Sequence, residues 1–80
     1  MSKRNSLTHQ VKLQDLLREV RTEAGLRQAD LAAKLSQPQS FVSKYESGER
    51  RLDILELRGV CQAIGLPFED FIKRLADTLK

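Results

Sequence analysis

Residues 28–51, QADLAAKLSQPQSFVSKYESGERR, decide the fold of this 80-residue chain. Apolar residues recur at helical spacing on both sides of a short polar break, and no segment alternates apolar and polar residues as a strand would. Pro38 lacks an N–H and fixes φ, which suits the first turn of a new helix. The stretch therefore predicts one helix over about 28–35 and a second over about 38–47, which Gly48 ends.

The second of these helices has two unlike faces, because successive residues are about 100° apart around a helix. One face, directed to a core, consists of Phe41, Val42 and Tyr45, and the other consists of Gln39, Ser40, Ser43, Lys44 and Ser47. Glutamine can bond an adenine edge, lysine a guanine edge, and serine either bases or phosphates, so the polar face matches the chemistry of a DNA major groove. The simpler alternative is an ordinary solvated face, although Glu, Lys and Arg suit that purpose better. Two short helices joined by so tight a turn predict a helix-turn-helix.

A longer helix is predicted before this stretch. It is expected to start near Val11 and to end at Gly25, which serves as a left-handed C-terminal cap. Its apolar stripe consists of Leu13, Leu16, Leu17, Val20 and Ala24. Residues 1–10 are polar and include Lys3 and Arg4, so they are expected to form a flexible basic arm in front of a domain that spans residues 11–80.

Two more helices are predicted after the stretch. Asp53 and Glu56 form a capping box at the start of the first, and Leu52 can pack on Leu57 as a hydrophobic staple. Its buried side is expected to continue through Leu55, Val60, Cys61 and Ile64, up to a stop at Gly65. Pro67 opens the last helix. The chain is therefore predicted to be an all-α, compact five-helix domain.

The last helix has an unusually long apolar stripe for so small a domain. The stripe consists of Phe68, Phe71, Ile72, Leu75 and Leu79. Because exposed apolar patches commonly mark interfaces, this helix is expected to supply the interface of a homodimer. The alternative is that all five side chains are buried within one chain.

Composition narrows the classes of function. The net charge of +3 arises within residues 1–12, and the remaining residues balance to zero, so bulk charge alone does not establish a nucleic-acid partner. A single cysteine, Cys61, excludes an intrachain disulfide, and with one distant histidine, His9, it gives no metal-ligand spacing, so no metal or cofactor is expected. Cys61 is interpreted as a small buried hydrophobe. No apolar run approaches a membrane span and no signal peptide is evident, which leads us to expect a cytoplasmic protein.

An enzyme is not predicted. The sequence shows no paired carboxylates in a pocket-forming context, no nucleophile with its base, and no glycine-rich phosphate loop. The candidate functions are therefore those of binding proteins.

The run LLREVRTEAGLRQADLAAKLSQPQSFVSKYESGERRLDILELRGVCQAIGL, from Leu16 to Leu66, resembles the Cro and lambda-repressor type helix-turn-helix family, often called XRE. Its most specific parts are GLRQADLAAKL and QSFVSKYESGERR. The resemblance implies a sequence-specific transcriptional regulator that binds double-stranded DNA as a homodimer on a roughly palindromic operator. The alternative is a protein-interaction module, antitoxin-like or coactivator-like, on the same scaffold.

The resemblance also implies roles for single residues. Contacts to base edges would come from Gln39, Ser40, Ser43 and Lys44, and contacts to phosphates from Gln28, Arg50 and Arg51. Gln28 would also brace Gln39, and Arg21 would form an interhelical ion pair with Glu46. The sequence departs from the family where it has Arg27, Ser36, Gln37 and Pro38, in place of a Ser or Thr cap, a glycine, an apolar residue and a second Ser or Thr cap. These departures bear on the capping of the helix over 28–35 and on the geometry of the turn.

Overall fold

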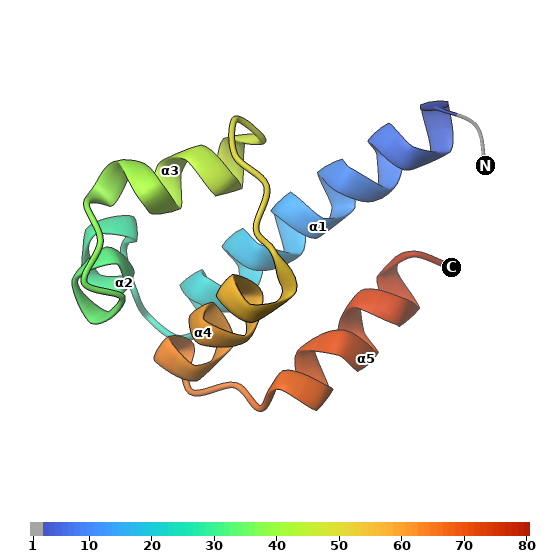
Figure 1. Ribbon diagram of the computed structural model, residues 1–80. Helices are drawn as coiled ribbons and strands as arrows, with labels where there is room; N and C mark the ends of the chain where they lie inside the picture. Colours follow the sequence, from blue (N-terminus) through green and yellow to red (C-terminus); the bar gives the residue numbers. More distant parts are fainter. Residues whose placement is uncertain (1–2) are drawn as a thin grey trace.

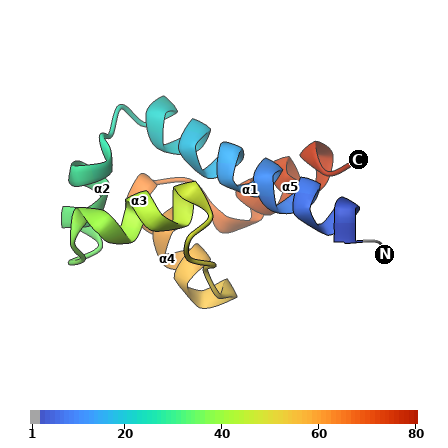
Figure 2. The ribbon, with the colours of Figure 1, turned by 90° about the horizontal axis from the view of Figure 1, so that it is seen from above.

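The computed structural model describes the backbone of residues 3–80 and the side chains of residues 8–80. Its helices are α1 (Lys3–Glu23), α2 (Gln28–Lys34), α3 (Gln39–Ser47), α4 (Ile54–Ile64) and α5 (Phe68–Thr78). No strand occurs among the described residues, so the predicted all-α fold of five helices is confirmed. In Figure 1, α2 and α3 lie at one end of the molecule, while α1 and α5 extend towards the end where both termini lie; Figure 2 shows the same arrangement from above.

The start of α1 differs from the prediction. The helix begins at Lys3 and not near Val11, so the predicted helix start was wrong and residues 3–10 belong to α1. The division into a basic segment over residues 1–10 and a domain over residues 11–80 stays a prediction. The physical reason is that residues 3–10 contain neither glycine nor proline, and each residue added to an existing helix gains a backbone hydrogen bond. The side chains of Lys3 and Arg4 lie outside the described residues.

One hydrophobic core lies where the five helices meet. It consists of Leu16, Leu17, Val20, Leu31, Ala32, Val42, Tyr45, Leu57, Val60, Cys61 and Phe71. All five helices contribute to it, which explains why the short α2 and α3 are stable in this chain: helices of seven and nine residues are marginal in isolation.

Two residues that were expected on buried stripes are exposed. Leu55 is 73% exposed, and its predicted burial was wrong because it stands two residues before Leu57 and so lies about 200° away around α4. Ala24 is exposed because α1 ends one residue before it. The stripe of α4 that does face the core runs through Leu57, Val60 and Cys61.

Candidate nucleic-acid interface

The turn between α2 and α3 keeps a tight geometry despite its unusual residues. Ser36 has a φ of 55°, in the left-handed region that favours glycine, and it therefore takes the conformation for which a glycine would be suited. The Gln37 N–H donates to the Ala32 carbonyl at 2.9 Å. Pro38 stands before α3 in an extended conformation, where its missing N–H costs no helical hydrogen bond.

The start of α2 is held by Asp30 in place of a serine or threonine cap. The Arg27 N–H donates to Asp30 Oδ2 at 2.9 Å, and the Arg27 guanidinium binds the same carboxylate with its Nε and Nη2, each at 3.0 Å. These side-chain hydrogen bonds from Arg27, together with the one from its backbone, lower the pKa of Asp30 to about 2. The carboxylate therefore stays charged at neutral pH, close to the positive end of α2.

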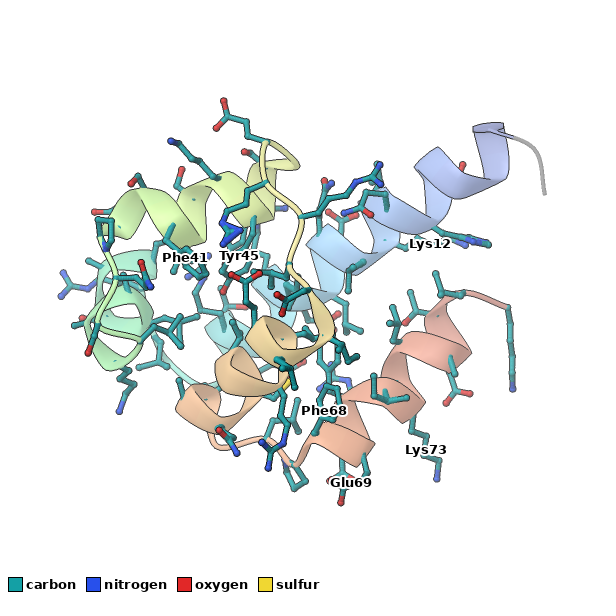
Figure 3. The ribbon with its side chains drawn as sticks, in the orientation of Figure 1. Lys12, Phe41, Tyr45, Phe68, Glu69 and Lys73 are labelled. Atoms are coloured by element: carbon teal, nitrogen blue, oxygen red, sulfur yellow. The ribbon has the colours of Figure 1, made fainter. Side chains whose placement is uncertain are left out.

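The polar face of α3 lies outward. Gln39, Ser40, Lys44 and Ser47 are exposed, and Ser43 is half-buried. On the opposite side, the side chains of Phe41 and Tyr45 point into the molecule in Figure 3, where their rings meet edge to face with centroids 5.6 Å apart. The packing of α3 on the core thus leaves four of the five side chains of the predicted polar face exposed and the fifth, Ser43, partly accessible.

A buried carboxylate joins the first three helices. Glu46 of α3 is 1% exposed, and its two oxygens accept from Arg21 of α1, Oε2 from Nε at 2.7 Å and Oε1 from Nη2 at 3.0 Å. Gln28 of α2 donates to Oε1 at 3.1 Å, and Arg18 donates to the Glu46 carbonyl at 3.3 Å. We call these four residues the Glu46 junction. It fixes α3 against both α1 and α2 at the end of α3 that is farther from the turn.

The hydrogen-bond partner of the Gln28 side chain differs from the one that the resemblance implied. Its amide group donates to Glu46, and within the described part of the chain it makes no hydrogen bond with Gln39. The brace that the resemblance implied between Gln28 and Gln39 is thus replaced by a brace to the buried carboxylate. Gln28 is half-buried at the first position of α2, the end of that helix away from the turn.

The two arginines after α3 have different surroundings. The Arg50 N–H donates to the Lys44 carbonyl at 3.2 Å, which folds the loop back onto the last turn of α3. The Arg50 guanidinium lies 4.8 Å above the centroid of the Phe41 ring and forms an ion pair with Glu56 of α4. Arg51 is exposed. Sequence reasoning treated the two as alike and assigned Glu56 only to the capping box, because periodicity does not reveal a pair that forms between a loop and a helix.

The apolar stripe of α5 is mostly used within the chain. Phe71 is fully buried, and Phe68 and Leu75 pack against the core. Ile72 is 38% exposed, and Leu79 is half-buried. On α4, Ile54 and Leu55 are exposed as well. The surface therefore keeps several apolar side chains on the two last helices.

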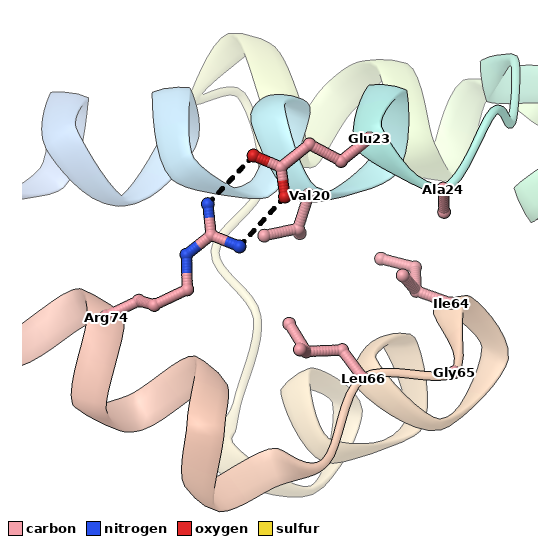
Figure 4. A pocket seen from close by; sticks show the side chains of 7 residues that line it. All are labelled: Val20, Glu23, Ala24, Ile64, Gly65, Leu66 and Arg74. Atoms are coloured by element: carbon pink, nitrogen blue, oxygen red, sulfur yellow. Dashed lines mark hydrogen bonds and ion pairs between the residues drawn. The ribbon is translucent and has the colours of Figure 1, made fainter.

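A small open pocket of about 190 Å³ lies between α1, α5, the end of α4 and the loop that precedes α5 (Figure 4). Arg74 of α5 closes one side of it by binding both oxygens of Glu23 on α1, at 2.9 and 3.0 Å. This contact raises the pKa of Arg74 and lowers the pKa of Glu23. The pair ties α5 to α1 at the surface.

Among the described residues, no helix combines the length and the apolar character that a membrane span requires. In the same part of the chain, no three His, Cys, Asp or Glu side chains gather as metal ligands would.

Comparison with known proteins places these features in a family. A family model described as helix-turn-helix matches residues 17–71, more than half of the chain. An XRE-family like protein from Pseudomonas syringae pv. tomato str. DC3000 is 43% identical, with a TM-score of 0.83 over 90% of this chain and 88% of that one. A comparison with curated proteins gave no match.

Two further solved structures share the fold at lower identity. The restriction-modification controller protein C.Esp1396I, solved as a tetramer in complex with its natural 35 base-pair operator, is 24% identical with a TM-score of 0.80, over 89% of this chain and 93% of that one. The clp gene regulator ClgR from C. glutamicum is also 24% identical, with a TM-score of 0.76 over 90% and 92% of the two chains. The chain thus has the fold of helix-turn-helix DNA-binding regulators, and it belongs to the XRE family of helix-turn-helix proteins.

Proposed function

We propose that this protein is a transcriptional regulator that binds a specific sequence of double-stranded DNA as a homodimer on a roughly palindromic operator. The observation that carries the proposal is the two-sided α3, whose buried side is held by the core and the Glu46 junction while its hydrogen-bonding side faces outward. A rigid helix that displays glutamine, serine and lysine is suited to the major groove. The operator complex of C.Esp1396I supports this use of the fold.

In this proposal, the residues of the interface have two roles. Base edges are contacted by Gln39, Ser40, Ser43 and Lys44, and phosphates by Gln28, Arg50 and Arg51. Phosphate contacts position the protein, whereas base contacts carry the sequence information. The two roles therefore predict different responses to mutation.

The test starts with selection of a binding site from random DNA, followed by measurement of affinity by fluorescence anisotropy at several salt concentrations. Gln39→Ala and Lys44→Ala should each cost ~1–3 kcal/mol on the selected duplex and relax the preference at one base pair. Arg51→Ala should weaken all sequences alike and reduce the salt dependence by about one unit of slope. Lys73→Ala is the matched control, because Lys73 is an exposed lysine on α5, on the far side of the molecule from α3 in Figure 3.

The opposite result would favour the protein-interaction module. If Gln39→Ala and Lys44→Ala change neither the affinity nor the selected sequence, the polar face of α3 does not read DNA. An antitoxin-like or coactivator-like role on the same scaffold would then be the better explanation.

The homodimer is proposed to use α5. Ile72 is the exposed member of its stripe, and Phe68, Leu75 and Leu79 flank the buried Phe71. In a two-fold dimer, two copies of α3 would reach half-sites about 34 Å apart, one helical turn along the duplex. Sedimentation at tens of micromolar protein should show a dimer that Ile72→Glu dissociates. A monomer both with and without DNA would contradict the proposed dimer.

A further inference from the structure

We infer that Glu56 is a positioning residue for DNA binding. Its carboxylate holds the Arg50 guanidinium against the Phe41 ring, so that the exposed edge of the guanidinium is already oriented when a DNA phosphate arrives. The inference rests on the proposed function, since it assigns a role to a residue that supports one of the phosphate contacts.

The guanidinium of Arg50 is held from two sides. One face lies over the Phe41 ring of α3 at 4.8 Å, within the range of a favourable cation–π contact. Its Nη2 binds Glu56 Oε2 of α4. The side chain is nevertheless 38% exposed, and an arginine has five N–H donors, so further donors are available for a phosphate oxygen. The contacts thus restrain the guanidinium but, within the described part of the chain, leave some of its N–H donors without a partner that would prevent them from binding a phosphate.

Glu56 is itself fixed in place. Its Oε1 accepts from the Asp53 N–H at 3.0 Å, while its own N–H donates to Asp53 Oδ1 at 2.7 Å. The next residue, Leu57, is part of the core. One carboxylate oxygen therefore completes the cap of α4 and the other binds Arg50, and the guanidinium is tied to a helix start that is anchored in the core.

Such restraint lowers the loss of side-chain conformational entropy that accompanies a phosphate contact. An arginine that is mobile before binding loses side-chain freedom when it meets DNA, which lowers affinity by about two- to tenfold per side chain. For Arg50, part of that freedom is already lost in the free protein. The negative charge of Glu56 acts in the opposite direction, because it repels the DNA backbone whether or not Arg50 is present. A mutant cycle separates these two effects.

The cycle compares the protein with its Arg50→Ala, Glu56→Gln and double variants on the selected duplex. Glutamine at position 56 retains the capping box, since a glutamine oxygen also accepts from the N-cap N–H, but it removes the charge that binds Arg50. Arg50→Ala should cost about tenfold in affinity when Glu56 is present and about threefold or less when Gln occupies position 56. In the Arg50→Ala background, Glu56→Gln should leave affinity unchanged or raise it.

The coupling between Arg50→Ala and Glu56→Gln in DNA affinity decides the inference, and the opposite sign of that coupling would overturn it. If Arg50→Ala costs as much or more with Gln at position 56, Glu56 is an inert neighbour of Arg50 or a competitor of the phosphate. Glu49→Gln is the control for charge alone, because Glu49 is an exposed carboxylate in the same loop and makes no hydrogen bond or ion pair with Arg50 among the described residues. Its effect should be the same with and without Arg50.

A measurement without DNA distinguishes positioning from a general loss of structure. NMR relaxation of the Arg50 Nε–H should show a more mobile side chain in Glu56→Gln, while the thermal midpoint of the variant stays close to that of the parent. Unchanged mobility would also refute the inference. Failure of the proposed function looks different: the unmodified protein would then select no duplex, or the Gln39 and Lys44 variants would bind as it does.

Discussion

Replacement of Arg21 by methionine should destabilise the protein far more than the loss of a surface ion pair. Methionine keeps much of the length of the arginine stem but offers no hydrogen bond to Glu46, which is 1% exposed. The Glu46 carboxylate loses two hydrogen bonds, of 2.7 and 3.0 Å. The Leu26 carbonyl loses a third, which Arg21 donates to it at 2.9 Å. A buried charge is left without its main partner.

The size of the effect follows from the remaining partners. Breaking a buried ion pair by removing one member costs ~3–5 kcal/mol. The lower value, about 3 kcal/mol, applies here because Gln28 still donates to Glu46 Oε1 at 3.1 Å and Arg18 Nε lies 3.8 Å from the same oxygen. For a domain of this size each kcal/mol lowers the midpoint of thermal unfolding by roughly 4–8 °C, so the expected decrease is roughly 12–24 °C.

Urea and thermal unfolding followed by circular dichroism would measure this. Arg74→Met is the matched control, because Arg74 binds both oxygens of Glu23 with similar distances but at the surface, and it should cost no more than ~1 kcal/mol. The double variant Arg21→Met/Glu46→Leu should recover most of the stability, since it leaves no unpaired buried charge. A loss for Arg21→Met no larger than that for Arg74→Met would refute the reasoning.

Three further outcomes can be measured by urea unfolding. Tyr45→Phe should raise the free energy of unfolding by about 1 kcal/mol, because the Tyr45 hydroxyl is buried without a hydrogen-bond partner among the described residues; a loss of stability would reveal a partner. Burial raises the pKa of the Cys61 thiol to about 11, above its unfolded value of ~8.5, so the folded state retains the proton longer and stability should fall as pH rises from about 9 to 11. Cys61→Ala should weaken this pH dependence, and an unchanged slope would contradict it. Gly48→Ala should cost at least ~1–2 kcal/mol, because Gly48 has a φ of +89° and a Cβ there would lie 2.6 Å from Gln14 Nε2; Gln14→Ala should relieve the steric part only.

Much of the fold could be predicted because it depends on local signals. The breaks at Gly25, Gly48 and Gly65 and the capping box at Asp53 mark helix ends within a few residues of where the structure has them. A glycine or a capping residue ends or starts a helix through its own backbone conformation and hydrogen bonds, so its effect can be recognised from the local sequence. The start of α1 lacks such a signal, and it was therefore predicted eight residues too late.

The contacts between elements could be predicted less well. The residues of the polar face of α3 follow from a 100° rotation per residue, and the structure does expose that face. The pairing of Arg50 with Glu56 depends on how a loop folds back between α3 and α4, and the bond from Gln28 to Glu46 depends on how α2 packs. Side-chain partners of this kind are decided by tertiary packing, which a one-dimensional pattern does not contain.

The division of α3 into two sides also bears on how such proteins diverge. Val42, Tyr45 and Glu46 maintain the fold, whereas Gln39, Ser40 and Lys44 make no contribution to the core and stand in solvent. Surface substitutions away from special contacts change stability by about 0.5 kcal/mol or less. Under the DNA recognition proposed above, a gene duplicate could therefore exchange all three exposed residues and acquire a new target while the scaffold keeps its stability. Selection for the DNA sequence and selection for folding would then act on different residues of the same nine-residue helix.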